Sequence, residues 1–247
     1  MLSIVILTKN EADRLPRCLA SLPSQTEIVI VDDYSSDETV PIAKQYQALV
    51  FPKELISFAD QKNFGLKHTS GDWVLFLDAD EYLSLELTKE IEDVVKHPQE
   101  VGGYFLPRRT VFLQKALRYG EFGLQRQLRL VKVSAQPSWN RVVHEELTVT
   151  GITGSLQHPL WHDPHRDLAH FATKINRYTS LEVIEADKIG TKVQGWELLA
   201  YPGAKFSVNY FCRFGFLDGF PGLVMAMMMS YYSFLKKAKI YFNNKIR

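Results

Sequence analysis

The 247-residue chain has few cysteines and no excess of charge of either sign. Its two cysteines, Cys18 and Cys212, lie far apart and form no C-x-x-C pair, which excludes a disulfide framework and suits a reducing compartment. The formal net charge is only +1, and no stripe of Lys and Arg interleaved with aromatic residues occurs outside the C-terminus. The low net charge and the lack of a basic stripe argue against nucleic-acid binding.

The chain also lacks the long apolar runs of exported and membrane-spanning proteins. The N-terminal segment Met1–Leu7 turns polar too soon for a signal-peptide core and has no basic leader, so we expect a cytoplasmic protein. The apolar segment Phe220–Leu235 is shorter than the roughly 20 residues that a spanning helix requires. We therefore expect no transmembrane helix in this chain.

What is present is the composition of an ordinary globular protein, with 46% hydrophobic and 23% charged residues. Four short apolar runs without polar alternation predict strands covered on both faces: Leu2–Leu7, Ile28–Val31, Ala48–Phe51 and Trp73–Leu77. Helical stretches separate them, and Ser84 is placed to cap a further helix that runs to Lys96. This β-α-β-α-β-α-β order predicts an α/β fold, a mostly parallel, Rossmann-like sheet with helices on both faces.

The second half of the chain has shorter predicted strands with Gly and Pro between them. These strands are Tyr104–Leu106, Leu128–Val133 and Glu146–Val149, and a helical stretch from Asp167 to Asp187 follows. We therefore predict a core domain over residues 1–165 and a C-terminal helical extension over residues 166–247.

Two carboxylates end the fourth predicted strand. Asp78 and Asp80 are separated by a single residue, so in an extended chain their side chains project from the same side. They lie at the end of a strand where open α/β sheets bind ligands. Carboxylate oxygens together with substrate phosphate oxygens are the ligands that Mg²⁺ and Mn²⁺ prefer. The pattern predicts a metal-bridged phosphate; the alternative is an acidic turn that caps the next helix.

Polar residues also follow the first two predicted strands. The first strand runs into Thr8-Lys9-Asn10-Glu11 instead of Gly-x-Gly-x-x-Gly, which argues against a dehydrogenase. The second ends in Asp32 and Asp33, whose carboxylates are suited to accept from a base N–H or ribose hydroxyls. The alternative for this acidic pair is a turn and helix cap.

Four motifs occur together in one order: Thr8-Lys9-Asn10-Glu11, Val31-Asp32-Asp33-Tyr34-Ser35-Ser36-Asp37, Lys62-Asn63-Phe64-Gly65 and Phe76-Leu77-Asp78-Ala79-Asp80. In order and spacing the chain resembles family 2 glycosyltransferases, which have the GT-A fold. The later Val143-His144-Glu145-Glu146 and His162 resemble the branch that includes lipopolysaccharide-core glucosyltransferases. The resemblance implies transfer of a sugar from a nucleotide diphosphate donor to a glycan or glycolipid acceptor hydroxyl, with inversion and with a divalent metal, Mg²⁺ or Mn²⁺.

The resemblance also implies roles for the metal and donor residues. Asp80 would bind the metal, Asp78 would be shared between the metal and the ribose, and His162 would supply a further ligand, with His158 and His165 as alternatives. The residues expected around the base, ribose and phosphates are Thr8, Asn10, Glu11, Asp32, Asp33 and Lys62. Arg129, in the segment Gln125–Arg129, is suited to a diphosphate or an anionic acceptor.

Inverting transfer requires a base on one face of the anomeric carbon and a cation near the leaving diphosphate on the other. Glu145 is our candidate for this base, and Glu146 is the alternative because the sequence does not fix which of the two faces inward. A structural reading of Glu145 is a strand-edge carboxylate paired with Arg141.

The C-terminus is basic and aromatic. No acid follows Asp218, while five cations are mixed with Tyr and Phe: Lys236, Lys237, Lys239, Lys245 and Arg247. This composition favours peripheral contact with an anionic membrane at its cytoplasmic face. The alternative is a helix packed on the domain with a solvated basic tail.

Two rival functions stay open at this point. A sugar-phosphate nucleotidyltransferase would be expected to carry a Gly-rich phosphate loop where this chain has Thr8–Glu11. A catalytically silent nucleotide-sugar-binding or membrane scaffold protein would share the fold without turnover.

Overall fold

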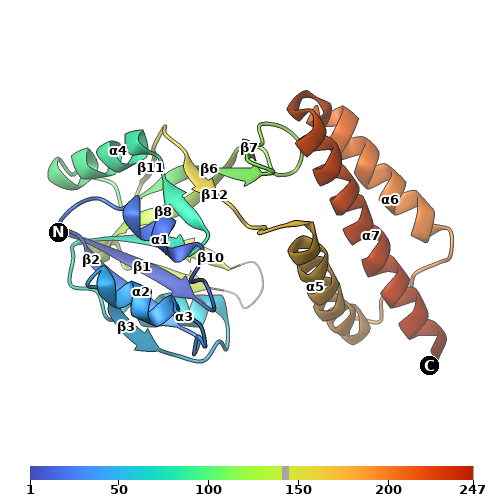
Figure 1. The fold of residues 1–247 in the computed structure, drawn as a ribbon, viewed down its shortest axis with the longest axis horizontal. Coiled ribbons are helices and arrows are strands. Elements are labelled where there is room, and N and C mark those ends of the chain that lie inside the picture. Colours follow the sequence, from blue (N-terminus) through green and yellow to red (C-terminus); the bar gives the residue numbers. More distant parts are fainter. Residues whose placement is uncertain (141–144, 247) are drawn as a thin grey trace. The chain divides into compact units, whose positions relative to one another are not determined.

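The computed structural model describes residues 1–140 and 145–246, which form two compact units. Unit 1 comprises residues 1–108 and 125–162, and unit 2 comprises residues 109–124 and 163–247. Unit 1 holds most of the sheet, and unit 2 is built mainly of helices (Figure 1). The domain boundary predicted after residue 165 stays a prediction.

The first four strands of unit 1 are parallel, as their continuous apolar sequences predict. They are β1 (Leu2–Thr8), β2 (Glu27–Asp32), β3 (Leu49–Pro52) and β4 (Trp73–Asp78). They lie in the order β3-β2-β1-β4, and helices α1 (Leu15–Ala20), α2 (Thr39–Gln45) and α3 (Phe58–Leu66) connect them. This part of the fold is the predicted Rossmann-like parallel sheet.

The remaining strands make the sheet mixed. They are β5 (Glu81–Leu83), β6 (Gly103–Phe112), β7 (Lys115–Ala116), β8 (Gln125–Lys132), β11 (Thr153–Ser155) and β12 (Leu160–His162). Strand β8 is antiparallel to both β4 and β6, and β12 is antiparallel to β5. Two further short strands, β9 (Ser138–Asn140) and β10 (Glu146–Thr148), form a separate antiparallel pair. The sheet is therefore parallel on one side of β4 and largely antiparallel on the other.

Alternate residues of β1 and β4 face two different hydrophobic clusters. Ile4 and Leu75 belong to the larger cluster, which includes residues of α1 and of α4 (Leu85–Lys96). Val5 and Phe76 belong to the second, which Trp139 of β9 and α3 complete on the opposite face. Successive side chains of a strand point to opposite faces of the sheet, and here both faces are covered by an apolar cluster. The strand sequences are therefore apolar at consecutive positions.

Helix α4 begins where the sequence predicts. The Ser84 hydroxyl accepts a hydrogen bond from the amide of Leu87 at 3.1 Å, and Glu86 lies in the first turn. Both features stabilise the amino end of a helix, the first by pairing a free N–H and the second through the helix dipole.

Unit 2 is built around α5 (Leu168–Lys188), α6 (Glu197–Ser207) and α7 (Phe220–Ile246). Helix α7 packs against both α5 and α6 (Figure 1). A π-helical turn (Val208–Cys212) and a 3₁₀ turn (Gly215–Asp218) connect α6 to α7. None of the described helices combines the length and apolar character that crossing a membrane requires.

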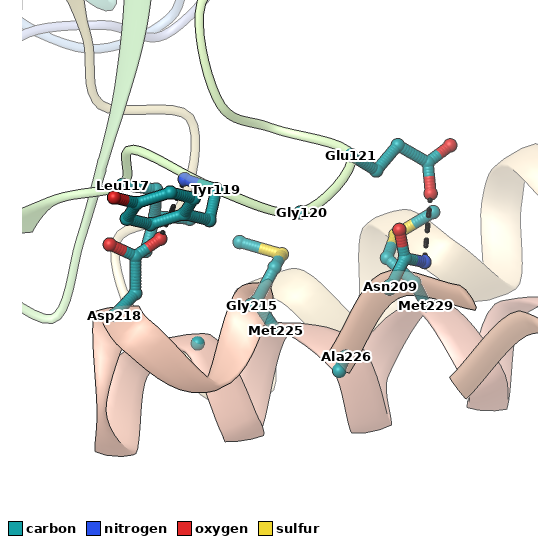
Figure 2. A pocket seen from close by; sticks show the side chains of 11 residues that line it. Leu117, Tyr119, Gly120, Glu121, Asn209, Gly215, Asp218, Met225, Ala226 and Met229 are labelled. Atoms are coloured by element: carbon teal, nitrogen blue, oxygen red, sulfur yellow. Dashed lines mark hydrogen bonds between the residues drawn. The ribbon is translucent and has the colours of Figure 1, made fainter. Parts of the chain in front are cut away.

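The segment Arg109–Leu124 completes unit 2. Asp218 accepts a hydrogen bond from the backbone amide of Arg118. It also accepts from the amide of Tyr119, and Asn209 donates to Glu121 at 3.3 Å (Figure 2). The cavity between these residues measures about 10 Å³, room for one water at most. These contacts are therefore read as structural support for the turn between α6 and α7.

Candidate active site

The carboxyl ends of β1, β2 and β4 bring the predicted residues to one edge of the sheet. In the strand register Thr8 lies opposite Asp32, and Leu7 lies opposite Asp78. The three sequence motifs that end these strands therefore meet because the strands are parallel neighbours.

Thr8, Asp32 and Asn10 hold the first two loops together. The Thr8 hydroxyl donates to the buried Asp32 carboxylate at 2.8 Å, and that carboxylate also accepts from the Ser35 amide at 2.7 Å and hydroxyl at 2.6 Å. The side-chain oxygen Oδ1 of Asn10 accepts from the Ser36 amide at 2.8 Å. Asn10 has a left-handed backbone (φ 52°), a conformation that Asn tolerates better than most residues. These bonds give both loops a fixed shape.

Asp33 and Glu11 lie beside this network. One Asp33 oxygen accepts from the Leu55 amide at 3.0 Å, while the other is 3.6 Å from the Lys9 ammonium. Glu11 forms a bidentate ion pair with Arg14, both contacts at 2.6 Å. Arg14 in turn reaches within 3.8 Å of the Asp80 carboxylate, so this loop is connected to the acidic pair.

Two cations hold Asp78. Its oxygens lie 3.6 Å from the Lys62 ammonium and 3.2 Å from the Arg129 guanidinium. Burial alone would raise the pKa of the Asp78 carboxyl, but the charges of Lys62, Arg129 and Arg108 outweigh it and hold that pKa far below its ordinary range. The two neighbouring cations therefore favour the ionised form of Asp78.

Lys62 connects the acidic pair to the candidate base. It is buried on α3, and its ammonium lies 3.6 Å from both Asp78 and Glu145 and 4.3 Å from the centre of the Trp139 ring. The neighbouring motif Asn63-x-Gly65, which drew attention to Lys62 in the sequence, has a structural reason. Asn63 exchanges two hydrogen bonds with the Trp139 backbone, at 2.8 and 2.9 Å, and Gly65 lets α3 approach the sheet closely.

The structure distinguishes the two candidate bases by position. Glu145 is partly buried and faces Lys62, whereas Glu146 begins β10 and is exposed. Arg141, Val143 and His144, which the sequence analysis named, lie outside the described residues.

Asp80 pairs with His162. The His162 Nε2 atom, at the end of β12, is 3.5 Å from Asp80, and β12 is positioned by its pairing with β5. Burial alone would raise the pKa of the Asp80 carboxyl, but the hydrogen bond and charge of His162, with the charge of Arg14, leave it below its ordinary value.

The other two histidines considered are engaged elsewhere. The ring of His158 is 2.9 Å from Glu90 at the surface, and His165 stacks on Phe171 in unit 2 with ring centres 3.6 Å apart. Of the three candidates, His162 is the one for which the described part of the chain shows a contact with the acidic pair.

Glu81 and Arg108 are also part of this site, although no motif in the sequence points to either of them. Glu81 is fully buried and accepts from Arg108 at 2.6 Å and from Arg129 at 3.2 Å, and its other oxygen accepts from the Asp78 amide at 3.0 Å. The signal available in the sequence was a third acid directly after Asp80 and an Arg within an apolar strand. Neither shows that these residues meet, because that depends on the pairing of β4 with β8 and of β8 with β6.

Comparison with known proteins identifies the family of this site. The model of the family described as glycosyl transferase family 2 matches residues 3–138, which include β1 to β4 and their polar ends. The chain belongs to glycosyl transferase family 2.

Two relatives are similar in sequence to this family 2 glycosyltransferase over nearly the whole of the present chain. An uncharacterized glycosyltransferase of Rickettsia felis is 30% identical, over 97% of this chain and 89% of its own. The lipopolysaccharide core biosynthesis glycosyltransferase LpsC of Rhizobium meliloti is 29% identical, over 97% of this chain and 92% of its own.

Solved structures agree with the fold. The mannosyltransferase PcManGT from Pyrobaculum calidifontis, solved in complex with GDP-Man and Mn²⁺, is 14% identical. Its structure covers 98% of this chain and 87% of its own with a TM-score of 0.54. The predicted GT-A-like α/β fold, with helices at the C-terminus, is confirmed.

Proposed function

We propose that this glycosyltransferase moves a hexose from a nucleotide diphosphate donor to a hydroxyl of a glycolipid or lipopolysaccharide-core-type acceptor, with inversion and with a divalent metal. The observation that carries the proposal is Lys62, which lies 3.6 Å from both Asp78 and Glu145, while Asp80 lies 3.5 Å from His162. These contacts supply a candidate base, a buried cation and a candidate pair of metal ligands. The acceptor class is supported by the likeness to LpsC over nearly the whole chain.

The residues present fit a divalent metal such as Mn²⁺ or Mg²⁺. Asp80 and His162 approach to 3.5 Å, a separation suited to two ligands that each lie about 2.1 Å from one ion. In the described part of the chain no group of three or more His, Cys, Asp or Glu side chains could hold a metal. Diphosphate oxygens of the donor would complete the shell, as is usual for Mg²⁺ and Mn²⁺ sites. When bound, the metal would neutralise charge on the leaving diphosphate.

Asp78 has a different environment from Asp80. Because Lys62 and Arg129 already neutralise its carboxylate, sharing it between the metal and the donor ribose stays a prediction. Arg129 has one guanidinium nitrogen, Nη1, that is buried and has no hydrogen-bond partner among the described residues. A donor phosphate oxygen is a suitable acceptor for this N–H group.

Glu145 is the proposed base for the acceptor hydroxyl. A carboxylate takes the proton as the oxygen attacks the anomeric carbon, and the leaving diphosphate departs on the opposite face. Lys62 positions the carboxylate, because its own location is fixed by burial in α3 and by the ring of Trp139.

The proposed donor contacts are Thr8, Asn10, Glu11, Asp32, Asp33 and Lys62. Most of these groups already bond to one another or to the adjoining loops. Their first effect is therefore to preorganise the loops that border the base and ribose, which lowers the cost of ordering them on binding.

The test is hydrolysis and binding of a panel of UDP-, GDP-, ADP- and dTDP-sugars with Mn²⁺ or Mg²⁺, then with chelator. We expect metal-dependent release of one nucleotide. Glu145→Gln should keep metal-dependent nucleotide binding and lose turnover by about 10²-fold or more, the usual contribution of a general base. Asp80→Asn should weaken the metal-dependent part of binding, and Glu146→Gln is the matched control.

A catalytically silent nucleotide-sugar-binding or scaffold protein is the alternative. It would show nucleotide binding that chelator leaves unchanged and no turnover with any donor and acceptor pair. Full activity of folded Glu145→Gln would contradict the proposed base.

A further inference from the structure

Unit 2 exposes a continuous apolar surface on α6, α7 and the turns between them. Between α6 and α7 lies an open groove of about 570 Å³ whose lining is almost entirely apolar. Leu199 and Met227 line it and are 79% and 57% exposed. Single exposed apolar residues are common on proteins, but a contiguous apolar patch marks a site of interaction.

An aromatic cluster continues the groove. Phe206 lines the groove, and its ring centre is 5.3 Å from that of Tyr210 and 6.2 Å from that of Phe211. Tyr210 contacts Phe216, and Phe216 contacts Phe214, each at 6.2 Å. Phe211 and Phe214 are 57% and 54% exposed. We call the groove and these five aromatic residues the C-terminal apolar surface.

The charge around this surface is mostly positive, because the acid beside it, Glu121, is paired with Lys205 at 2.8 Å. Between residues 198 and 246 the single acid is Asp218, which is buried and bonded to backbone amides. Arg213 is exposed within the aromatic cluster, and the exposed Arg118 lies close by, because the Gly120 amide donates to the Arg213 carbonyl at 2.9 Å. In residues 1–140 and 145–246 the structure shows neither guanidinium in an ion pair.

The lysines of α7 contribute less to this charge. Lys237 pairs with Glu197 at 2.6 Å, and Lys236 pairs with Glu182 at 3.3 Å. Lys239 donates to four oxygens of α5, three of them on the side chains of Asn176, Thr179 and Ser180. The basic C-terminus that the sequence shows is therefore largely used inside unit 2, and the aromatic turn with Arg213 is the better candidate for contact outside it.

We propose that the C-terminal apolar surface docks on an anionic lipid bilayer, with its aromatic side chains in the headgroup region and Arg213 and Arg118 on lipid phosphates. Aromatic and aliphatic side chains beside Lys and Arg are the composition of interfacial membrane segments. A second copy of the chain is a poorer occupant, because it would bring the same cations and no exposed acid of this region to receive them. The inference does not depend on the sugar donor or on turnover.

The native protein carries a probe site for the test. Cys212 is exposed and lies between Phe211 and Arg213, while Cys18 is buried. Burial, with the charges of Glu81, Asp80 and Asp78, raises the pKa of the Cys18 thiol, so an environment-sensitive thiol dye should react with Cys212. Vesicles of phosphatidylcholine alone and mixed with phosphatidylglycerol are then added to the labelled full chain. We expect an emission shift with the anionic vesicles that weakens as salt is added.

Vesicle sedimentation of unlabelled variants gives the second readout. Phe211→Ser with Phe214→Ser should lower the partition coefficient for anionic vesicles by about tenfold or more, since each ring leaves water on docking. Arg213→Glu should remove most of the preference for anionic lipid. The control is Leu49→Ser with Ile152→Ser, two exposed apolar residues of unit 1 that should not change partitioning.

The proposal would be overturned if the dye showed no emission shift with either kind of vesicle, or if the control variant lost as much partitioning as the double Phe variant. It would also be overturned if light scattering showed a dimer that the double Phe variant converts to a monomer. All variants should retain nucleotide-sugar hydrolysis in solution. A failure of membrane docking is thereby distinguished from a failure of the proposed transfer reaction.

Discussion

At the scale of single residues, the site depends on a buried acid that touches neither donor nor acceptor in the proposed reaction. Glu81 neutralises Arg108 and Arg129 and also accepts from the Asp78 amide, so it fixes the cations beneath the acidic pair. Its position explains how two guanidinium groups and several carboxylates share one small volume.

Glu81→Gln should therefore destabilise the protein strongly. The amide keeps the shape but loses the charge, and two cations are left beside it, so we expect a loss of about 3 kcal/mol in the free energy of unfolding. Urea denaturation measures this loss. Glu86→Gln, an exposed acid in the first turn of α4, is the control and should cost less than about 1 kcal/mol. Equal small effects would show that Glu81 is dispensable to the charge network.

The site residues that directly follow a strand could be predicted from the sequence. The site residues that meet only because distant strands pair could not. Asp78, Asp80 and Lys62 lie in local motifs, and the structure brings them together. Glu145 and His162 were already the first candidates from the sequence, and the positions of β10 and β12 add that Glu145 faces Lys62 and that His162 contacts Asp80. Glu81 and Arg108 had no local signal, because a buried charge is recognisable only with its partner.

At the scale of elements, Glu27 joins β2 to β1 and to the turn before β4. Its carboxylate accepts from the Ser3 hydroxyl and, at 2.7 and 2.8 Å, from the amide and hydroxyl of Ser70. Burial alone would raise the pKa of Glu27, but these hydrogen bonds outweigh it and leave it below the ordinary value of 4.5. The carboxylate thus favours the folded state only while it is ionised.

Glu27→Gln should consequently destabilise the protein in a pH-dependent way. Because the pKa is lower in the folded than in the unfolded state, the contribution is complete above about pH 4.5 and is lost as the pH falls through the folded value. We expect a difference of about 1 kcal/mol from the native chain at pH 7 that shrinks below pH 4.5. Urea denaturation at several pH values measures it, with the exposed Glu38→Gln as control. A difference independent of pH would contradict this account.

Helix α3 is held close to the sheet by Gly65. A Cβ at this position would lie 2.5 Å from Val5 Cγ1 and 3.0 Å from Val31 Cγ2, so Gly65→Ala should destabilise unit 1 by about 1–3 kcal/mol. Gly203 lies in α6 with open space around it, and Gly203→Ala should stabilise that helix by about 0.5–1 kcal/mol. Thermal unfolding of both variants checks these opposite signs, and stabilisation by Gly65→Ala would show that α3 has room to move.

The parallel strands were the most predictable elements. Burial on both faces gives β2 and β4 uninterrupted apolar interiors, and Ser3 is the one polar residue inside β1. The predicted bounds of these three strands differ from the observed ones by one residue at most. Strands β5 and β12 have three residues each, and their existence depends on a pairing across nearly 80 residues. No local pattern encodes such a pairing.

At the scale of the whole molecule, each unit has its own core. Two hydrophobic clusters lie within unit 1, and two further clusters lie within unit 2. The backbone passes between the units three times, after Arg108, Leu124 and His162. Separate cores favour separate cooperative transitions, since cooperativity comes from shared burial.

Calorimetry should accordingly resolve two unfolding transitions. A nucleotide added with Mn²⁺ should raise only the transition of unit 1, where the proposed site lies, because a ligand at 100 times its Kd stabilises the state that binds it by about 2.7 kcal/mol. Gly65→Ala should lower the same transition, while Gly203→Ala should raise the other. If nucleotide, metal and both variants all shifted a single common transition, the two cores would unfold as one cooperative unit. Unit 2 would then contribute directly to the stability of the transferase site.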